Sequence, residues 1–269
     1  MRVATERFGA ADRHPVVQAP LTLATASAAS QRGPQAAFYS RAMPAAVAPL
    51  SVHAPAGSAR GAVIVVQEAF GVNEHIEDVC RRLADAGWLA IAPHLFHRTG
   101  DPQLGYDDFS LVAPHFTAVN AETIFEDMDV ALAHAAGAGF DGSHTGVVGF
   151  CMGGTVALAT AVERSVGAAV TFYGGGVTTG RFGLPSLVEL APRLTVPWLG
   201  LYGDLDTGIP VADVEALRAA AASSGAPTEV VRYPEAEHGF NCDRRASYHA
   251  ESAGDAWQRM LDFFSAHLA

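Results

Sequence analysis

Residues 146–154 read Gly-Val-Val-Gly-Phe-Cys-Met-Gly-Gly. The apolar run Gly146–Phe150 is too short for a helix and predicts a buried β-strand, and the residues after it open a predicted helix. Cys151 therefore stands in a tight turn from strand to helix. Such a turn strains the backbone of its central residue. Side chains two positions before or after it would collide with neighbouring backbone, which accounts for Gly149 and Gly153.

Cys151 has two interpretations. In the first it is a nucleophile, because Gly-x-Cys-x-Gly after a strand matches the Gly-x-Ser-x-Gly elbow with cysteine in place of serine. The thiol would then project from the carboxyl edge of a sheet at a helix N-terminus, where the helix dipole and free N–H groups favour a thiolate. In the second it is a buried structural cysteine beside a turn. The motif alone leaves both open.

Short apolar runs alternate with amphipathic segments from residue 60 onward. This alternation, with nearly continuous apolar strands, predicts the α/β class: a mostly parallel sheet with helices on both faces. Asn73 is placed to cap the first helix, and Gly87 is placed to end it. The expected strands are Ala62–Gln67, Trp88–Ala92, Gly146–Phe150, Ala168–Tyr173, Pro197–Tyr202 and Glu229–Tyr233.

The sequence divides into a tail and one domain. Residues 1–48 are rich in Ala, Ser, Pro and Arg and lack periodicity, so we expect a mobile or poorly ordered N-terminal extension. A targeting segment or an over-called start site would have a similar composition. Residues 49–269 contain no linker and no internal repeat, so they are expected to form a single domain.

The composition excludes several classes of function. The formal net charge is −11, and an acidic body repels a phosphate backbone, so nucleic acid is not an expected partner. All 17 basic residues are arginine, which excludes mechanisms that need a lysine. No apolar stretch is long enough to predict a membrane span. Three cysteines form no disulfide framework and suit a reducing cytoplasm: Cys80, Cys151 and Cys242.

Two later strand ends carry the partners that an activated cysteine needs. Asp204 and Asp206 follow the strand expected at Pro197–Tyr202, and His238 follows the next one along the chain. In elbow enzymes the nucleophile comes first in the chain, then the acid, then the histidine. Ligands bind at the carboxyl edge of a parallel sheet, where these residues are expected. This order favours the nucleophile interpretation of Cys151.

Four separated motifs resemble those of the dienelactone hydrolase family of α/β-hydrolases. The resemblance covers residues 49–268, most of the chain. It implies an α/β-hydrolase fold and an enzyme that cleaves an ester or lactone of a small molecule through an acyl-enzyme, without a cofactor or a metal ion. The motifs are Gln67–Asn73, Gly149–Gly154, Gly203-x-x-Asp206-x-x-Ile209-Pro210 and His238-Gly239-Phe240.

The resemblance assigns catalytic roles residue by residue. It implies that Cys151 is the nucleophile, His238 the general base and Asp206 the acid that orients the imidazole. Asp204 competes for the acid role, but the family's acid stands four residues before the proline, as only Asp206 does. We therefore interpret Asp204 as a turn residue whose carboxylate bonds nearby N–H groups.

Glu68 ends the first buried strand, where an unpaired carboxylate is costly. The resemblance implies that it contacts the resting thiol of Cys151 and holds it neutral until substrate displaces the contact. The alternative is a structural acceptor for loop amides. The backbone N–H groups of Ala69 and Met152, one after each matching strand, are then the expected oxyanion hole.

Residues 94–118 lack periodicity and predict a long functional loop, such as a lid. His94-x-x-His97 would be half a metal site, but no further ligands complete it, so no metal is expected. We expect the aromatic side chains of this segment to line the substrate pocket, although they would also serve to pack the segment onto the domain. They are Phe96, Tyr106, Phe109 and Phe116.

One feature of the substrate site departs from the family. Dienelactone carries a free carboxylate that the best-known members bind with arginines, one of them four residues past the catalytic histidine. Here that position is Cys242, and no arginine occurs between Arg98 and Arg164. We therefore expect neutral esters or lactones to be preferred, unless Arg98, Arg244 or Arg245 reaches the pocket from elsewhere.

Two alternatives to a dienelactone hydrolase-like enzyme stay open. One is a general carboxylesterase or thioesterase on the same scaffold. The other is a non-catalytic binding protein that kept the fold, and it is disfavoured because such a protein would not need all four residues of the proposed site. They are Glu68, Cys151, Asp206 and His238.

Overall fold

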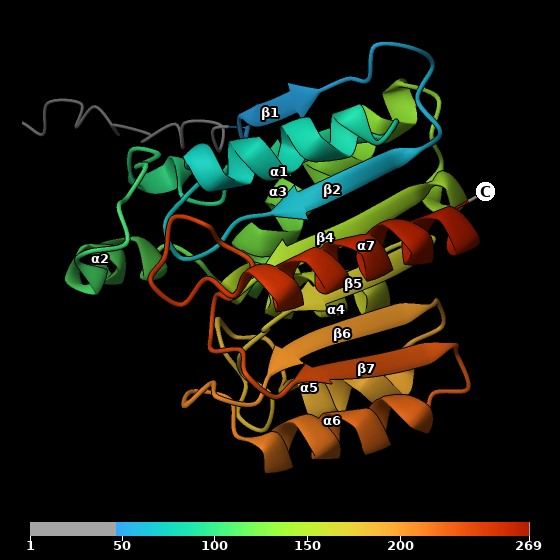
Figure 1. Ribbon diagram of the computed structural model, residues 1–269. Helices are drawn as coiled ribbons and strands as arrows, with labels where there is room; N and C mark the ends of the chain where they lie inside the picture. The colour runs from blue at the N-terminus through green and yellow to red at the C-terminus, as the bar shows by residue number, and fades with distance from the viewer. Residues whose placement is uncertain (1–46, 269) are drawn as a thin grey trace, which may run out of the picture. The chain divides into compact units, whose positions relative to one another are not determined.

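Six apolar runs of the sequence and one edge strand form a seven-stranded sheet in the computed structural model, which describes residues 47–268 (Figure 1). The strands lie in the order β1-β3-β2-β4-β5-β6-β7, with β1 antiparallel to β3 and every other neighbouring pair parallel. All residues of β2 to β6 are buried, because a parallel sheet is covered on both faces. The strands are β1 Leu50–His53, β2 Ala62–Val66, β3 Leu89–Pro93, β4 Thr145–Phe150, β5 Ala168–Phe172, β6 Trp198–Gly203 and β7 Thr228–Tyr233.

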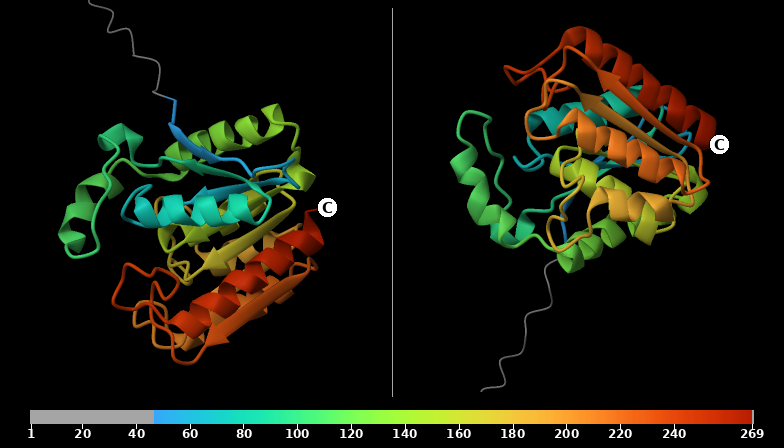
Figure 2. Two further views of the ribbon diagram at one scale, coloured as in Figure 1. Left: turned by 45° about the horizontal axis from the view of Figure 1, so that its top comes forward. Right: turned by 90° about the horizontal axis from the view of Figure 1, so that it is seen from below.

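Helices cover both faces of this sheet, as the two views of Figure 2 show. Helices α1 and α7 lie on one face, and α3, α4, α5 and α6 lie on the other. The predicted α/β class is confirmed. No helix within residues 47–268 is both long and apolar enough to cross a membrane. The helices are α1 Glu74–Asp85, α2 Ala113–Phe116, α3 Ala121–Gly137, α4 Met152–Glu163, α5 Leu187–Leu190, α6 Val211–Ala222 and α7 Ala250–His267.

The N-terminal part of the chain differs from the sequence prediction in one element. Strand β1 pairs with β3 at the edge of the sheet, with Leu50 opposite Pro93 and His53 opposite Ala90. The sequence analysis missed it because an antiparallel edge strand buries little of its surface, and Leu-Ser-Val-His forms no apolar run. The expected extension, residues 1–48, lies outside the described residues except for its last two and stays a prediction.

Helix α1 shows how local signals position the first site motif. The Asn73 side chain accepts a hydrogen bond from the Ile76 N–H and caps the helix, as predicted. Cys80 lies on the buried face of the helix, and Gly87 adopts a φ of 93° just after it. The loop between β2 and α1 is thereby held at the carboxyl edge of the sheet.

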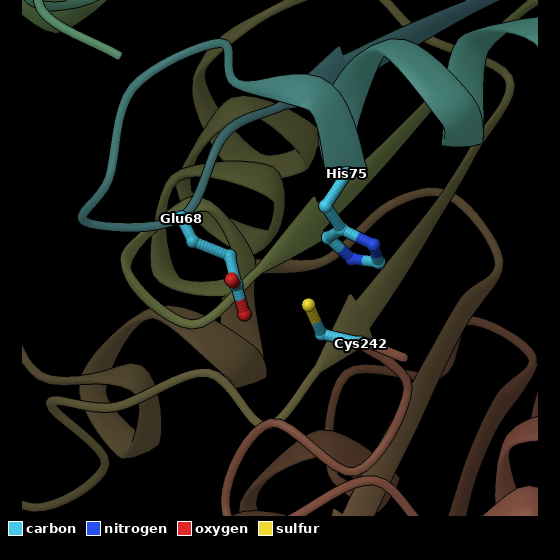
Figure 3. Close-up of side chains that lie close together, drawn as sticks. All are labelled: Glu68, His75 and Cys242. Atoms are coloured by element: carbon cyan, nitrogen blue, oxygen red, sulfur yellow. The ribbon is translucent and has the colours of Figure 1, made fainter. Parts of the chain in front are cut away.

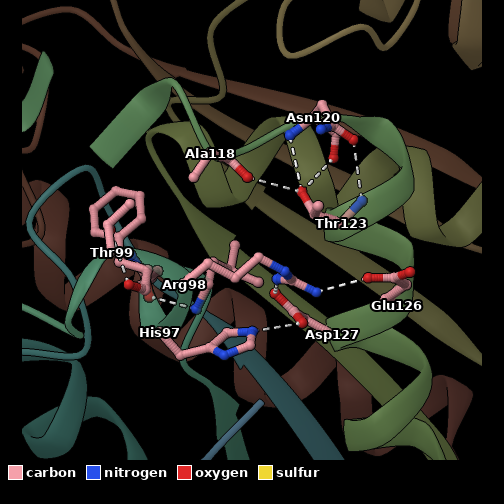
Figure 4. Close-up of polar contacts among 11 residues, drawn as sticks. His97, Arg98, Thr99, Ala118, Asn120, Thr123, Glu126 and Asp127 are labelled. Atoms are coloured by element: carbon pink, nitrogen blue, oxygen red, sulfur yellow. Dashed lines mark hydrogen bonds and ion pairs between the residues drawn. The ribbon is translucent and has the colours of Figure 1, made fainter. Parts of the chain in front are cut away.

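The segment 94–118 contains three short helical pieces where the sequence predicted only a loop. Its first part is tied to α3 by the buried carboxylate of Asp127 (Figure 4). Asp127 accepts hydrogen bonds from Arg98 Nη1 at 2.7 Å and His97 Nε2 at 3.1 Å. His94 bonds a different carboxylate, Asp101, at 2.7 Å. The two histidines therefore have separate structural partners.

Removing the Asp127 carboxylate is expected to loosen this attachment. Asp127→Ala leaves the buried His97 side chain without an acceptor and removes one of the two carboxylate partners of Arg98, the other being Glu126, so the free energy of unfolding should fall by about 2–3 kcal/mol. Urea denaturation measures the loss. The control is Asp129→Ala, which removes a half-exposed partner of Arg164 and should cost less than about 1 kcal/mol. Equal losses in the two variants would contradict this assignment.

Candidate active site

Cys151 alone makes the turn between β4, which ends at Phe150, and α4, which begins at Met152. Its backbone has φ 55° and ψ −115°, a combination that side chains rarely adopt. A Cβ on Gly149 would overlap the carbonyl of Gly153, and one on Gly153 would overlap backbone carbonyls at the end of β2. The two glycines therefore allow the close packing that holds the strained turn, as the sequence predicted.

His238 lies between Cys151 and Asp206 at the carboxyl edge of the sheet. Its Nδ1 is 2.6 Å from Oδ2 of Asp206, whose residue is only 5% exposed. Burial lowers the pKa of His238, but hydrogen bonds to Asp206 and Cys151 outweigh burial and raise this pKa to about 10. A pKa this high keeps the His238 imidazole protonated at neutral pH.

The two aspartates after β6 have different partners. Besides His238, Asp206 binds the Gly208 N–H through Oδ1 at 2.8 Å. Asp204 binds Arg232 with both oxygens, each 2.7 Å from a guanidinium nitrogen. A carboxylate held this way is not available to the imidazole. Asp206, which the spacing to Pro210 favoured, is the aspartate beside His238. Asp204 pairs with the guanidinium of Arg232 and not with the loop amides that we expected.

A pocket of about 290 Å³ opens beside Cys151 and His238. Larger hollows of about 420 and 380 Å³ lie elsewhere on the described surface, but no cysteine lines them. The chemistry of the lining residues, and not size, therefore identifies the site. The 290 Å³ pocket is lined by Phe70, Phe109, Cys151, Gly175, Gly176, Arg181, Asp206, Thr207, Gly208, Ile209, His238 and Arg245.

Glu68 is fully buried just beyond the end of β2. Its Oε1 lies 3.4 Å from Nη1 of Arg245, and its Oε2 has no hydrogen-bond partner. Within residues 47–268 no hydrogen bond joins Glu68 to Cys151. Glu68 is therefore partnered by a guanidinium and not by the Cys151 thiol or by loop amides.

The expected oxyanion donors lie on the two segments that follow β2 and β4. Met152 is the first residue of α4, so its N–H has no acceptor one turn earlier in the helix. The Ala69 N–H donates no hydrogen bond to any described residue. Both groups are therefore free to bind a substrate oxygen.

Only one of the four aromatic residues expected at the substrate lines the pocket, namely Phe109. Phe96 is 1% exposed and stacks on His115, with ring centroids 5.5 Å apart. Phe116 packs edge-on against Phe182 at 5.2 Å. Phe96 and Phe116 thus attach the segment to the domain, which corrects their assignment to the substrate.

Tyr106 lies next to the pocket lining and not in it. Its ring packs on Phe70 with centroids 4.5 Å apart, and its hydroxyl accepts a hydrogen bond from Asn73 at 3.1 Å. Tyr106 therefore supports Phe70, a pocket residue that the sequence analysis quoted within a motif but did not assign to the substrate.

Two arginines line the pocket. The expectation of a preference for neutral substrates rested on the absence of a guanidinium there, and that absence is not observed. Arg245, one of three residues considered from the sequence, lies over the rings of Phe70 and Tyr106 at 5.7 and 5.5 Å. Arg181, which no sequence signal indicated, lies over Phe182 at 5.5 Å and forms no ion pair with a described residue. The other two candidates do not line the pocket: Arg98 binds Asp127, and Arg244 binds Glu74.

The fold and the strained cysteine turn with its histidine and aspartate define an α/β-hydrolase. The model of the dienelactone hydrolase family matches residues 50–268. The chain therefore belongs to the dienelactone hydrolase family, and it is a hydrolase that acts on ester or lactone bonds.

Individual relatives agree with this family. A candidate carboxymethylenebutenolidase of Yersinia pestis is 46% identical over 207 residues, which cover 76% of this chain and 78% of the relative. One from Methylorubrum extorquens is 42% identical over 205 residues, covering 75% and 70%. The crystal structure of a candidate dienelactone hydrolase from Klebsiella pneumoniae superposes with a TM-score of 0.75 at 42% identity, covering 82% of this chain and 93% of that one.

The raised pKa of His238 predicts a specific pH dependence of stability. Because the folded-state pKa of about 10 exceeds the ordinary 6.5, the charged imidazole stabilises the folded protein fully below pH 6.5 and progressively less up to pH 10. The free energy of unfolding lost in His238→Gln should therefore be largest on the acidic side of this range and decline towards pH 10. Urea unfolding across the range measures it. A loss that grows with pH would contradict the prediction.

Proposed function

We propose that this protein hydrolyses the ester or lactone bond of a small molecule through a thioester acyl-enzyme on Cys151. The observation that carries the proposal is the arrangement of three side chains at one sheet edge. Cys151 sits in the strained turn and lines one pocket with His238, whose Nδ1 lies 2.6 Å from Oδ2 of buried Asp206. Membership of the dienelactone hydrolase family supports the bond class.

The reaction follows from the charges of these groups. The Cys151 thiolate attacks the carbonyl carbon, and the carbonyl oxygen gains the negative charge, which the Ala69 and Met152 N–H groups stabilise. The imidazolium of His238 gives its proton to the departing alkoxide as the carbon–oxygen bond breaks. Neutral His238 then deprotonates water, which attacks the thioester. The carboxylic acid leaves, and the ion pair of thiolate and imidazolium is restored.

We assign Glu68 a supporting role in this cycle. Its pairing with Arg245 keeps a guanidinium at the pocket wall, and release of that pair would free the carboxylate to turn towards the thiol. Among the described residues Glu68 bonds Arg245 and forms no hydrogen bond with Cys151. We therefore assign the contact between Glu68 and the thiol to a later step of the cycle and not to the resting protein. Three free cysteines support a reducing compartment such as the cytoplasm.

The arginines of the pocket support a substrate that carries an anionic group, such as the carboxylate of dienelactone. Arg181 is the anchor we assign, because it has no carboxylate partner among the described residues. This reverses the preference for neutral substrates expected from the sequence. A second candidate, a general carboxylesterase for neutral esters, is favoured by one observation: Glu68 already neutralises Arg245.

Loss of the nucleophile is the first test. Cys151→Ala should lower turnover of an activated ester such as p-nitrophenyl acetate by at least about a thousandfold while the protein stays folded, because the members of a catalytic triad act as a unit. The control is Cys80→Ala, which removes a thiol buried on α1 away from the pocket and should retain most of the activity. More than a tenth of wild-type turnover in Cys151→Ala would overturn the acyl-enzyme.

The two aspartates supply a matched pair of variants. Asp206→Asn should lower kcat by several hundredfold or more, because the imidazole loses the group that sets its tautomer. Asp204→Asn should cost less than about tenfold, since it only weakens the pair with Arg232. Steady-state kinetics of both variants measures the difference. If the larger loss occurs in Asp204→Asn, the acid role belongs to Asp204.

The charge of the substrate separates the two candidate functions. Arg181→Gln should lower kcat/KM for dienelactone about tenfold or more relative to its methyl ester, because a guanidinium–carboxylate pair is lost. Arg193→Gln is the control, since Arg193 pairs with Glu163 on another surface. A wild-type protein that prefers the methyl ester, with a ratio unaltered in Arg181→Gln, would favour the general carboxylesterase.

A further inference from the structure

Three buried side chains with different donor atoms meet behind the pocket (Figure 3). Glu68 follows β2, His75 lies in the first turn of α1, and Cys242 lies in the loop between β7 and α7. One carboxylate oxygen, one ring nitrogen and the thiol sulfur all lie within 4.8 Å of one another. The three residues are 0, 3 and 0% exposed.

Two polar atoms of this cluster are buried without a hydrogen bond. They are Oε2 of Glu68 and Nε2 of His75. A buried polar atom that makes no hydrogen bond costs free energy, so two of them in one cluster call for an explanation. In Figure 3 the carboxylate, the imidazole and the thiol turn towards a common centre. A ligand that accepts electron pairs from all three would satisfy both orphaned atoms.

We propose that Glu68, His75 and Cys242 bind one divalent cation of the zinc class. Thiolate sulfur with imidazole nitrogen and a carboxylate is the donor set of Zn²⁺, and the sulfur disfavours Mg²⁺ and Ca²⁺. Bond lengths of about 2.0–2.3 Å require the donors to approach to about 3.5 Å, a small contraction of the observed cluster. On binding, the Cys242 S–H bond breaks, a sulfur–metal bond forms and the proton leaves to solvent.

The surroundings supply an entry path and a fourth ligand position. His75 lines two surface hollows of about 380 and 280 Å³. A water molecule would complete the tetrahedron, as at other zinc sites with three protein ligands. Glu68 bonds Arg245 through Oε1 and keeps Oε2 free, so the cation does not have to break that pair. The site shares Glu68 with the proposed catalytic cycle, and a bound cation would keep this carboxylate from turning towards Cys151. It does not depend on the roles of Cys151, His238 and Asp206.

The test uses Zn²⁺ and Co²⁺ on the full chain in a Cys151→Ser background. That background removes the other thiol–imidazole pair, which would bind the same metals. Zn²⁺ affinity and stoichiometry are measured by titration calorimetry. Co²⁺ reports a thiolate ligand through a near-ultraviolet charge-transfer absorption. Further variants add Cys242→Ser, His75→Gln or, as a control for a buried thiol outside the cluster, Cys80→Ser. Circular dichroism establishes that each variant is folded.

We expect one Zn²⁺ per chain in Cys151→Ser and in the Cys80→Ser control. Adding Cys242→Ser should abolish the Co²⁺ charge-transfer absorption, and Cys242→Ser and His75→Gln should each weaken Zn²⁺ binding at least about a hundredfold. Because two ligands are tested separately, one variant that fails to fold leaves the other as the test. No binding to Cys151→Ser, or binding that neither ligand substitution weakens, would overturn the proposal.

Discussion

Cys151 holds a backbone conformation, φ 55° and ψ −115°, that is stable only in closely packed surroundings. Gly149 and Gly153 permit that packing, since a side chain on either would overlap backbone carbonyls. The parallel pairing of β4 with β2 and β5 brings the turn, Glu68 and Tyr173 to the same edge of the sheet. The geometry of the pocket therefore depends on this one strained turn.

Paired charges organise the same edge. Asp206 pairs with His238, Glu68 with Arg245 and Asp204 with Arg232, so each of the three carboxylates has its own cation. Pairing of this kind lowers the cost of burying a carboxylate, and it separates the aspartates into distinct environments. A chain without lysine meets this need with planar guanidinium groups, which bind carboxylates with two nitrogens and also cover aromatic rings, as Arg245 covers Phe70.

Most of the fold could be predicted because its signals are local. Buried parallel strands are continuous apolar runs, and the glycines around Cys151 are required by backbone contacts within a few residues. Strand β1 was missed because its edge position buries little surface. The choice of Asp206 over Asp204, which the family resemblance implied from the spacing to Pro210, agrees with the geometry.

The pocket walls could not be predicted in the same way. The segment 94–118 contains three phenylalanines, Phe96, Phe109 and Phe116, but only Phe109 lines the pocket. Their positions depend on how this segment packs against α3 and against the loop that contains Phe182. Arg181 comes from a loop with no periodicity. Tyr173, with a φ of 38° and its ring 5.1 Å from that of His238, likewise carried no recognisable signal. These contacts are long-range, so a linear pattern does not contain them.

The proposed acyl-enzyme on Cys151 is tested most directly by trapping it. Wild-type protein is mixed with a slowly released ester, quenched in acid during turnover, digested and analysed by mass spectrometry. We predict one acyl group per chain, attached to the peptide that contains Cys151, appearing and disappearing at rates consistent with kcat. An acyl group on a different residue, or turnover without any covalent species, would contradict the account.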